Sequence, residues 1–116
     1  GTGTSENDTI ESEIIRKVFG EKAYGLPVSS VKSMLGHLIA AAGAVEGIIC
    51  ALAIERSTAP MTANLTTPDP ECDLDYVTEG CRSMQIDTAM SNSFGFGGSN
   101  SCLVFRSRGR AESRDT

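Results

Sequence analysis

The sequence lacks the residue patterns typical of metal-binding, nucleotide-binding and membrane-spanning proteins. Its four cysteines, at positions 50, 72, 81 and 102, form no CxxC pair, so we expect reduced thiols and no zinc site. It contains no GxGxxG fingerprint and no P-loop. Its most apolar stretch, residues 36–54, is at the short limit of the roughly 20 residues that a membrane span requires, and it contains His37 and Glu46.

Positive charge is also scarce. Ten Lys and Arg residues against fifteen Asp and Glu residues give a formal net charge of −5. Nucleic acids and anionic membranes are bound by surfaces rich in Lys and Arg. We therefore expect no nucleic-acid partner and no membrane partner.

The length of 116 residues allows one small domain with a core of its own. Alternating helical and β-branched segments predict an α/β fold. A polar opening predicts a helix over residues 8–19 that ends at Gly20. The other predicted elements are a buried strand at 27–31, a buried helix at 36–54, an extended loop or short edge strands at 58–70, a strand at 74–77, a hairpin of strands 88–92 and 101–105 with a Gly-rich loop, and a flexible tail at 107–116.

The single histidine closes the motif KSMLGH at residues 32–37, where the predicted strand passes into the predicted long helix. His37 would then occupy the first helical turn, whose positive dipole end favours neutral imidazole over imidazolium. Neutral imidazole can donate a hydrogen bond to a carbonyl oxygen. Alternatively, His37 caps the helix or satisfies a polar group of the core.

Four sequence blocks together carry a resemblance to a known family. They are GTGT at residues 1–4 followed by Asp8, VKSMLGH at 31–37, NL at 64–65 with PDP at 68–70 and CDLD at 72–75, and NSFGFGG at 92–98. In this order, over residues 1–106, they resemble the condensing enzymes, specifically the β-ketoacyl-acyl carrier protein synthases of type II fatty acid synthesis.

The resemblance implies a fold and leaves part of the site outside this chain. The family architecture is thiolase-like, two mixed α/β halves packed in five layers, and residues 1–106 resemble the C-terminal half. In the family a catalytic histidine immediately precedes the GTGT block, and the nucleophilic cysteine lies much further upstream. We therefore expect a C-terminal portion that is inactive alone and that works in the cytoplasm with the missing N-terminal half, as a homodimer.

The family reaction is a decarboxylative Claisen condensation of malonyl-acyl carrier protein with an acyl-enzyme thioester. Its hard step is the stabilisation of negative charge on the malonyl thioester oxygen as CO₂ leaves. By resemblance, His37 is one of two neutral histidines that donate to this oxygen, and Lys32 supports the site through a hydrogen-bond network. A lysine is usually a surface residue, but a position at the end of a buried strand argues against that alternative for Lys32.

The resemblance also assigns residues to the substrate. Thr2 and Thr4 match hydroxyls that contact the phosphopantetheine arm of the acyl carrier protein; the alternative is a simple Gly/Thr turn. Phe96 matches a gatekeeper over an acyl pocket and Phe94 lines its entrance; the alternative is a hairpin loop with two core phenylalanines. The glycines around both rings suit a mobile gate.

No cofactor is implied, apart from a monovalent cation held by Glu46, Ser91 and Asn92. Alternatively, Glu46 pairs with the lysine of the KSMLGH motif, because a buried carboxylate requires a partner. Cys50 in the predicted long helix and Cys102 in a predicted strand are typical of inert, buried thiols. Neither matches the family's nucleophile.

Three other functions use a related fold. A chain-length factor is a non-catalytic partner subunit, and a polyketide ketosynthase extends a different class of chain. The presence of Lys32 and His37 favours an enzyme, and the run Asn92-Ser93-Phe94 resembles fatty acid synthases more than aromatic polyketide synthases. A degradative thiolase fits the motifs less well.

Overall fold

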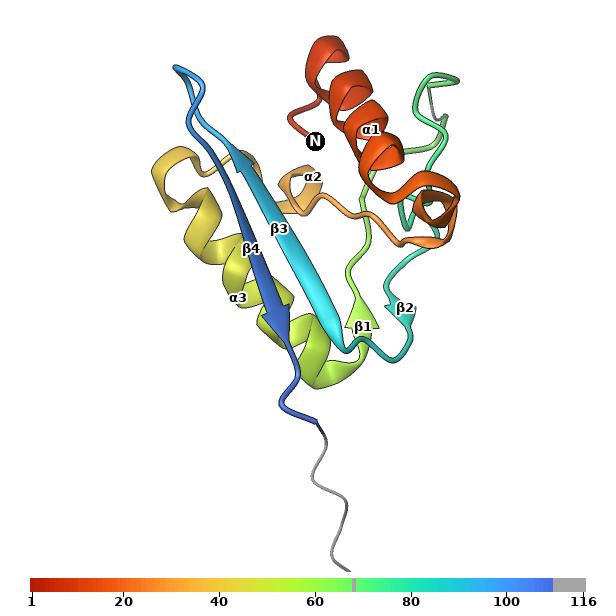
Figure 1. Ribbon diagram of the computed structural model, residues 1–116, viewed down its shortest axis with the longest axis vertical. Helices are drawn as coiled ribbons and strands as arrows, with labels where there is room; N and C mark the ends of the chain where they lie inside the picture. The colour runs from red at the N-terminus through yellow and green to blue at the C-terminus, as the bar shows by residue number, and fades with distance from the viewer. Residues whose placement is uncertain (68, 110–116) are drawn as a thin grey trace, which may run out of the picture. The chain divides into compact units, whose positions relative to one another are not determined.

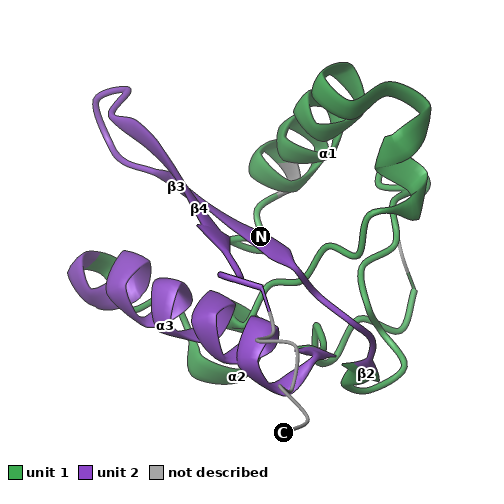
Figure 2. Cartoon of the chain, turned by 60° about the horizontal axis from the view of Figure 1, so that its bottom comes forward, with its two compact units in different colours: residues 1–39, 59–82 green, residues 40–58, 83–116 purple. Residues whose placement is uncertain are grey.

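The computed structural model describes residues 1–67 and 69–109, so Pro68 of the PDP block and most of the predicted tail lie outside the described residues. The chain forms two compact units, residues 1–39 with 59–82, and residues 40–58 with the described part of 83–116 (Figure 2). In chain order (Figure 1) the elements are α1 (Ser5–Phe19), the 3-10 helix η1 (Gly20–Gly25), α2 (Lys32–Leu35), the 3-10 helix η2 (Ile39–Ala41), α3 (Ala42–Arg56), β1 (Thr58–Ala59), β2 (Arg82–Ser83), β3 (Thr88–Phe94) and β4 (Asn100–Arg106).

Helix α1 forms where the sequence predicts it, although it begins at Ser5 rather than at position 8. Its first turn is acidic and its last turn is basic, the arrangement that the helix dipole favours. Gly20, with a φ of 59°, ends the helix as predicted, because glycine adopts positive φ at little steric cost.

Polar contacts tie α1 to residues of the same unit far along the chain. The Ser12 hydroxyl is buried and lies 2.7 Å from the hydroxyl of Tyr76. Arg16 forms an ion pair with Asp73 and donates to the carbonyl oxygen of Glu71 at 3.3 Å. Much of the apolar face predicted for α1 is exposed, at Ile10, Ile14 and Val18.

The strands predicted at 27–31 and 74–77 do not form. One parallel bridge, between Pro27 and Asp75, is all that pairs them. A ladder cannot extend here because proline lacks a backbone N–H and Val77 adopts a φ of 49°. The predicted extended loop at 58–70 is confirmed, since β1 is the one regular element within the described part of that range.

The predicted helix at 36–54 is broken at its start. A separate short helix, α2, ends at Gly36, whose φ of 75° directs the chain out of the helix. Helix α3 begins only at Ala42. His37 therefore lies in an exposed connector, so the prediction that it occupies the first turn of the long helix is wrong.

The second unit contains the predicted hairpin. Strands β3 and β4 pair antiparallel from Thr88 with Arg106 to Phe94 with Asn100, and α3 packs against both strands. The structure corrects the prediction that this helix is buried nearly all round. Among its described residues only Gly47 is buried.

The buried apolar residues of the described chain all lie in the first unit. Many other large apolar side chains of the described residues are exposed, and these are found in both units. The buried set is Ala23, Val31, Ala59, Leu74 and Val77.

Candidate functional site

The first unit contains a cavity of about 720 Å³, lined by residues from three of the four motif blocks. Four of the predicted site residues line it together: Thr2, Thr4, Lys32 and His37. They come from segments more than twenty-five residues apart in the sequence. The structure thus brings together the predicted charge-stabilising and arm-binding residues in one place.

Two serines connect three of the segments that line this cavity. Ser30 donates from its hydroxyl to the carbonyl oxygen of Gly1 at 3.2 Å, and its backbone N–H donates to the Thr62 hydroxyl at 3.1 Å. Ser33 donates to the carbonyl oxygen of Ser30 at 3.0 Å and accepts from the Ala63 N–H at 2.8 Å. Because each serine joins groups of different segments, the cavity wall is cross-linked by hydrogen bonds.

The imidazole of His37 is oriented by the chain that follows it. The backbone N–H of Ile39 donates to Nδ1 of His37 at 3.1 Å. In a neutral ring held this way, Nδ1 is the acceptor and the hydrogen resides on Nε2. The connector therefore fixes which ring nitrogen of a neutral His37 carries the hydrogen. The donor role of His37 toward a substrate stays a prediction.

The GTGT block lies close to Ser30, two residues before the KSMLGH block. A Cβ atom on Gly1 would lie 3.1 Å from Cβ of Ser30, so glycine permits this approach. The hydroxyls of Thr2 and Thr4 lie 2.8 Å apart, and both residues are exposed. A slender ligand in the cavity can therefore reach both hydroxyls.

Lys32 is the first residue of α2 and is half-buried. The prediction that it ends a buried strand is wrong, because no strand precedes it. Lys32 nevertheless belongs to the cavity lining together with Ser33 and His37.

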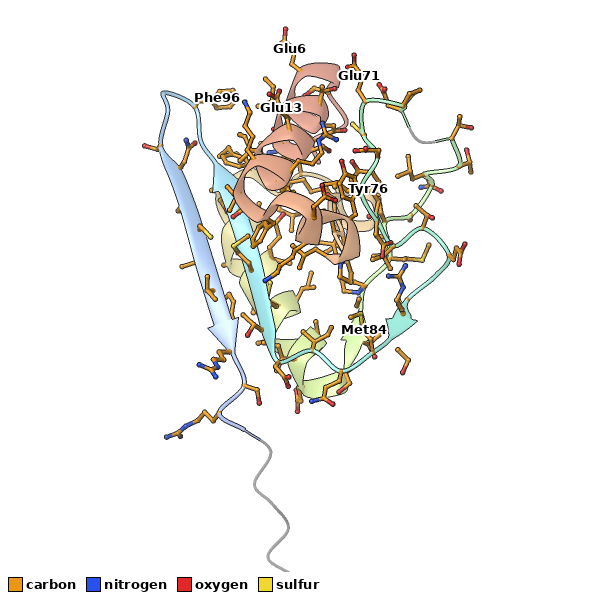
Figure 3. All side chains as sticks on the ribbon, turned by 45° about the vertical axis from the view of Figure 1, so that its right-hand side comes forward. Glu6, Glu13, Glu71, Tyr76, Met84 and Phe96 are labelled. Atoms are coloured by element: carbon orange, nitrogen blue, oxygen red, sulfur yellow. The ribbon has the colours of Figure 1, made fainter. Side chains whose placement is uncertain are left out.

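The remaining predicted site residues belong to the second unit. Glu46 is half-buried on α3. On β3, Ser91 is buried and Asn92 is half-buried. Phe94 is 48 % exposed at the end of β3, and Phe96 is fully exposed in the turn of the hairpin (Figure 3). The alternative of two core phenylalanines is therefore not what this chain adopts, while the gate and the cation site stay predictions.

The cysteines differ from their predicted surroundings. Cys102 is exposed on β4, contrary to the prediction of a buried thiol, and Cys50 is half-buried on α3. Burial, together with the nearby charge of Glu46, raises the pKa of the Cys50 thiol. Cys50 therefore stays protonated at neutral pH, which does not suit a nucleophile.

Sequence reasoning missed the polar residues that shape the first unit. Arg82 donates to both carboxylate oxygens of Asp75, at 2.5 and 2.9 Å, and these hydrogen bonds lower the pKa of Asp75. Burial raises the pKa of Tyr76, which is one of the residues that line the cavity. The CDLD block contains Asp75, but its partner lies seven residues further on, beyond any local pattern.

A comparison with known protein families identifies this arrangement. Residues 1–66 match the family described as Beta-ketoacyl synthase, C-terminal domain, which is more than half of the chain. The chain belongs to the beta-ketoacyl synthase family. The predicted resemblance to the C-terminal portion of these condensing enzymes is confirmed.

Curated relatives of this synthase domain are condensing enzymes of two pathways. It is 57 % identical over 104 residues to 3-oxoacyl-acyl-carrier-protein synthase 2 of Coxiella burnetii, covering 90 % of this chain and 25 % of the relative. It is 49 % identical to the tetracenomycin polyketide synthase ketoacyl synthase alpha subunit of Streptomyces glaucescens, and this match covers 90 % of this chain and 24 % of the relative. The chain thus spans about a quarter of the length of these relatives.

Solved structures agree with this assignment. One is a type II polyketide synthase acyl-carrier protein in complex with its ketosynthase, with a TM-score of 0.86 and 47 % identity over 89 % of this chain and 25 % of that one. Another is the ishigamide ketosynthase/chain length factor, with a TM-score of 0.89 and 39 % identity. This match covers 94 % of this chain and 27 % of that one. The α/β fold, the C-terminal half of a thiolase-like architecture, is therefore confirmed for the synthase domain.

No described helix of the synthase domain combines the length and apolar character that crossing a membrane requires.

Proposed function

We propose that this chain is the charge-stabilising part of a 3-oxoacyl-acyl-carrier-protein synthase that elongates fatty acids. The observation that carries this function is the hydrogen bond that Nδ1 of His37 accepts from the Ile39 N–H at 3.1 Å. A neutral ring held this way offers its Nε2–H to a substrate oxygen. The cavity that His37 lines is also bordered by Thr2, Thr4 and Lys32. The names of the relatives support the reaction class.

In this reaction the bond between the malonyl α-carbon and its carboxylate breaks, and CO₂ leaves. The electron pair passes to the thioester as an enolate, whose oxygen accepts a hydrogen bond from Nε2 of His37. Preorganised donors of this kind stabilise developing charge without reorganisation. The α-carbon then attacks the acyl thioester, the C–C bond forms, and the cysteine thiolate leaves. We assign that cysteine and a second histidine donor to parts of the protein outside this chain.

The remaining residues have supporting roles in this proposal. Thr2 and Thr4 bind the phosphopantetheine arm of an acyl carrier protein, in keeping with the structural neighbour that is an acyl-carrier protein in complex with its ketosynthase. Lys32 supports His37 through hydrogen bonds. Phe94 and Phe96 gate the acyl pocket. Glu46, Ser91 and Asn92 bind a monovalent cation with a structural role, and no other cofactor takes part.

The proposed assembly is larger than this chain. Because the chain spans about a quarter of its curated relatives, we expect it to be inactive alone and to act with an N-terminal half in a homodimer. The free state of all four cysteines in the structure is consistent with the cytoplasm.

The deciding experiment measures two half-reactions in the intact protein. His37→Ala should lower malonyl decarboxylation by about 100-fold or more, whereas acyl transfer to the cysteine should stay near the wild-type rate. His37→Gln keeps a side-chain N–H, so its decarboxylation rate should lie between those of the wild type and His37→Ala. Equal loss of both half-reactions would indicate a folding defect and would contradict the assigned role.

Polyketide synthesis is the second candidate, favoured by the 49 % identity to the tetracenomycin ketosynthase subunit. Product analysis separates the two pathways. With a saturated acyl starter and malonyl carrier protein, a fatty acid enzyme releases one 3-oxoacyl product per condensation, whereas a polyketide enzyme extends unreduced chains. A wild-type protein without any decarboxylation would instead indicate a non-catalytic chain-length factor.

A further inference from the structure

We propose that Ser33 is a positioning residue that sets the place of His37 in the cavity. Its hydroxyl is used in both directions, donating to the carbonyl oxygen of Ser30 at 3.0 Å and accepting from the backbone N–H of Ala63 at 2.8 Å. Ser33 is half-buried, so these partners are only partly replaceable by water. The hydroxyl therefore joins the KSMLGH motif to the segment on the neighbouring cavity wall.

The local structure around Ser33 explains why this connection matters. Helix α2 has only four residues, and a helix of one turn is not stable without outside contacts. Gly36 ends it with a φ of 75°, and glycine does not by itself fix the direction of the following chain. The path from α2 to His37 therefore depends on how α2 is anchored, and Ser33 provides one anchor.

The same anchor also aligns the neighbouring wall. Ala63 is followed by Asn64, which adopts a φ of 64° and lines the cavity. Thr62, on the other side of Ala63, accepts from the backbone N–H of Ser30 and donates its own N–H to the carbonyl oxygen of Val77 at 2.9 Å. Removal of the Ser33 hydroxyl would thus loosen both walls at once, while the charged and donor groups of the cavity would remain present.

The role of Ser33 rests on the proposed function, because its catalytic readout is decarboxylation at His37. In the intact protein, Ser33→Ala should lower kcat for malonyl decarboxylation by up to about 100-fold, the loss that misplacement by about an ångström can produce. The KM for malonyl carrier protein and the acyl-transfer rate should stay near wild type. Ser33→Thr, which keeps the hydroxyl, should restore kcat, and Ser33→Cys, a weaker donor and acceptor, should give an intermediate rate.

Amide hydrogen exchange reports on the contact without catalysis. The Ala63 amide should exchange faster in Ser33→Ala and should regain protection in Ser33→Thr. Ser83→Ala, which removes an exposed hydroxyl on β2, is the matched control and should change neither kcat nor Ala63 exchange.

Three results would overturn the role of Ser33. The first is a wild-type decarboxylation rate in Ser33→Ala, and the second is an Ala63 amide that stays protected in that variant. The third is an equal fall of both half-reactions together with a lower unfolding temperature, which would make Ser33 purely structural. If the wild-type protein itself does not decarboxylate malonyl carrier protein, the proposed function fails, and with it the catalytic role, while exchange at Ala63 still shows whether the contact exists.

Discussion

At the scale of single residues, backbone groups matter as much as side chains. The backbone N–H of Ile39 sets the tautomer of His37, although Ile39 has a φ of 51° and its side chain is 78 % exposed. A β-branched residue seldom adopts positive φ, so this backbone conformation is strained. A left-handed isoleucine has no sequence signal, so the contact that orients His37 could not be predicted, and the donor role of His37 stays a prediction.

Asp75 carries a prediction about pH. Hydrogen bonds from Arg82 lower its pKa below the ordinary value of 3.8 in the folded chain. Its contribution to stability is therefore fully present above the unfolded pKa and is lost as the pH falls through the folded pKa. In urea unfolding of the intact protein, Asp75→Asn should lower the midpoint at pH 7, and the difference from wild type should shrink below pH 4, roughly the ordinary carboxyl pKa.

Asp87→Asn is the control for this pH effect, since the side chain of Asp87 is exposed and accepts from the neutral amide of Gln85. It should shift the midpoint little at either pH. A difference between Asp75→Asn and wild type that is unchanged at acidic pH would show that the charge of Asp75 is not what stabilises the fold.

At the scale of secondary-structure elements, periodicity predicted the long and regular pieces. Helix α1 and the β3–β4 hairpin lie where the apolar patterns placed them. The short runs at 27–31 and 74–77 failed, because a strand needs a partner in register and the sequence offered no sign that only Pro27 and Asp75 would pair. Motif resemblance, rather than periodicity, predicted which residues line the cavity, and hydroxyl contacts such as that of Ser33 were not predicted.

Gly47 shows how α3 approaches the hairpin. A Cβ atom at this position would lie 3.3 Å from Cζ of Phe105, closer than an ordinary contact. Gly47→Leu should therefore force the ring or the helix to move and should destabilise the protein by about 1–3 kcal/mol. Ala44→Leu, at an exposed position of the same helix, should be nearly neutral because both residues favour helix.

Denaturant unfolding of the two variants tests this packing. Equal midpoints for Gly47→Leu and Ala44→Leu would show that α3 does not depend on glycine for its approach to Phe105. The hairpin itself should form in both variants, since its register is set by backbone pairs from Thr88 with Arg106 to Phe94 with Asn100.

At the scale of the whole molecule, exposed apolar surface is the dominant physical fact. Residues spaced four apart on α1, Ile10, Ile14 and Val18, are 54 %, 45 % and 69 % exposed, and together they form a continuous apolar strip on one face of the helix. Water-exposed strips of this kind favour association. The chain on its own should therefore self-associate, whereas in the proposed intact protein other parts would cover such surface.

Sedimentation velocity of the isolated 116-residue chain tests this expectation over a range of concentrations. The average sedimentation coefficient should rise with concentration, and Val18→Glu should reduce that rise because it places a charge in the apolar strip. Thr66→Glu adds the same charge at an exposed loop position outside the strip and should leave the association unchanged. A chain that stays monomeric at every concentration would show that the strip is tolerated in water. If both substitutions reduce association equally, net charge and not the strip is the cause. A contact through the strip would respond only to the change at Val18.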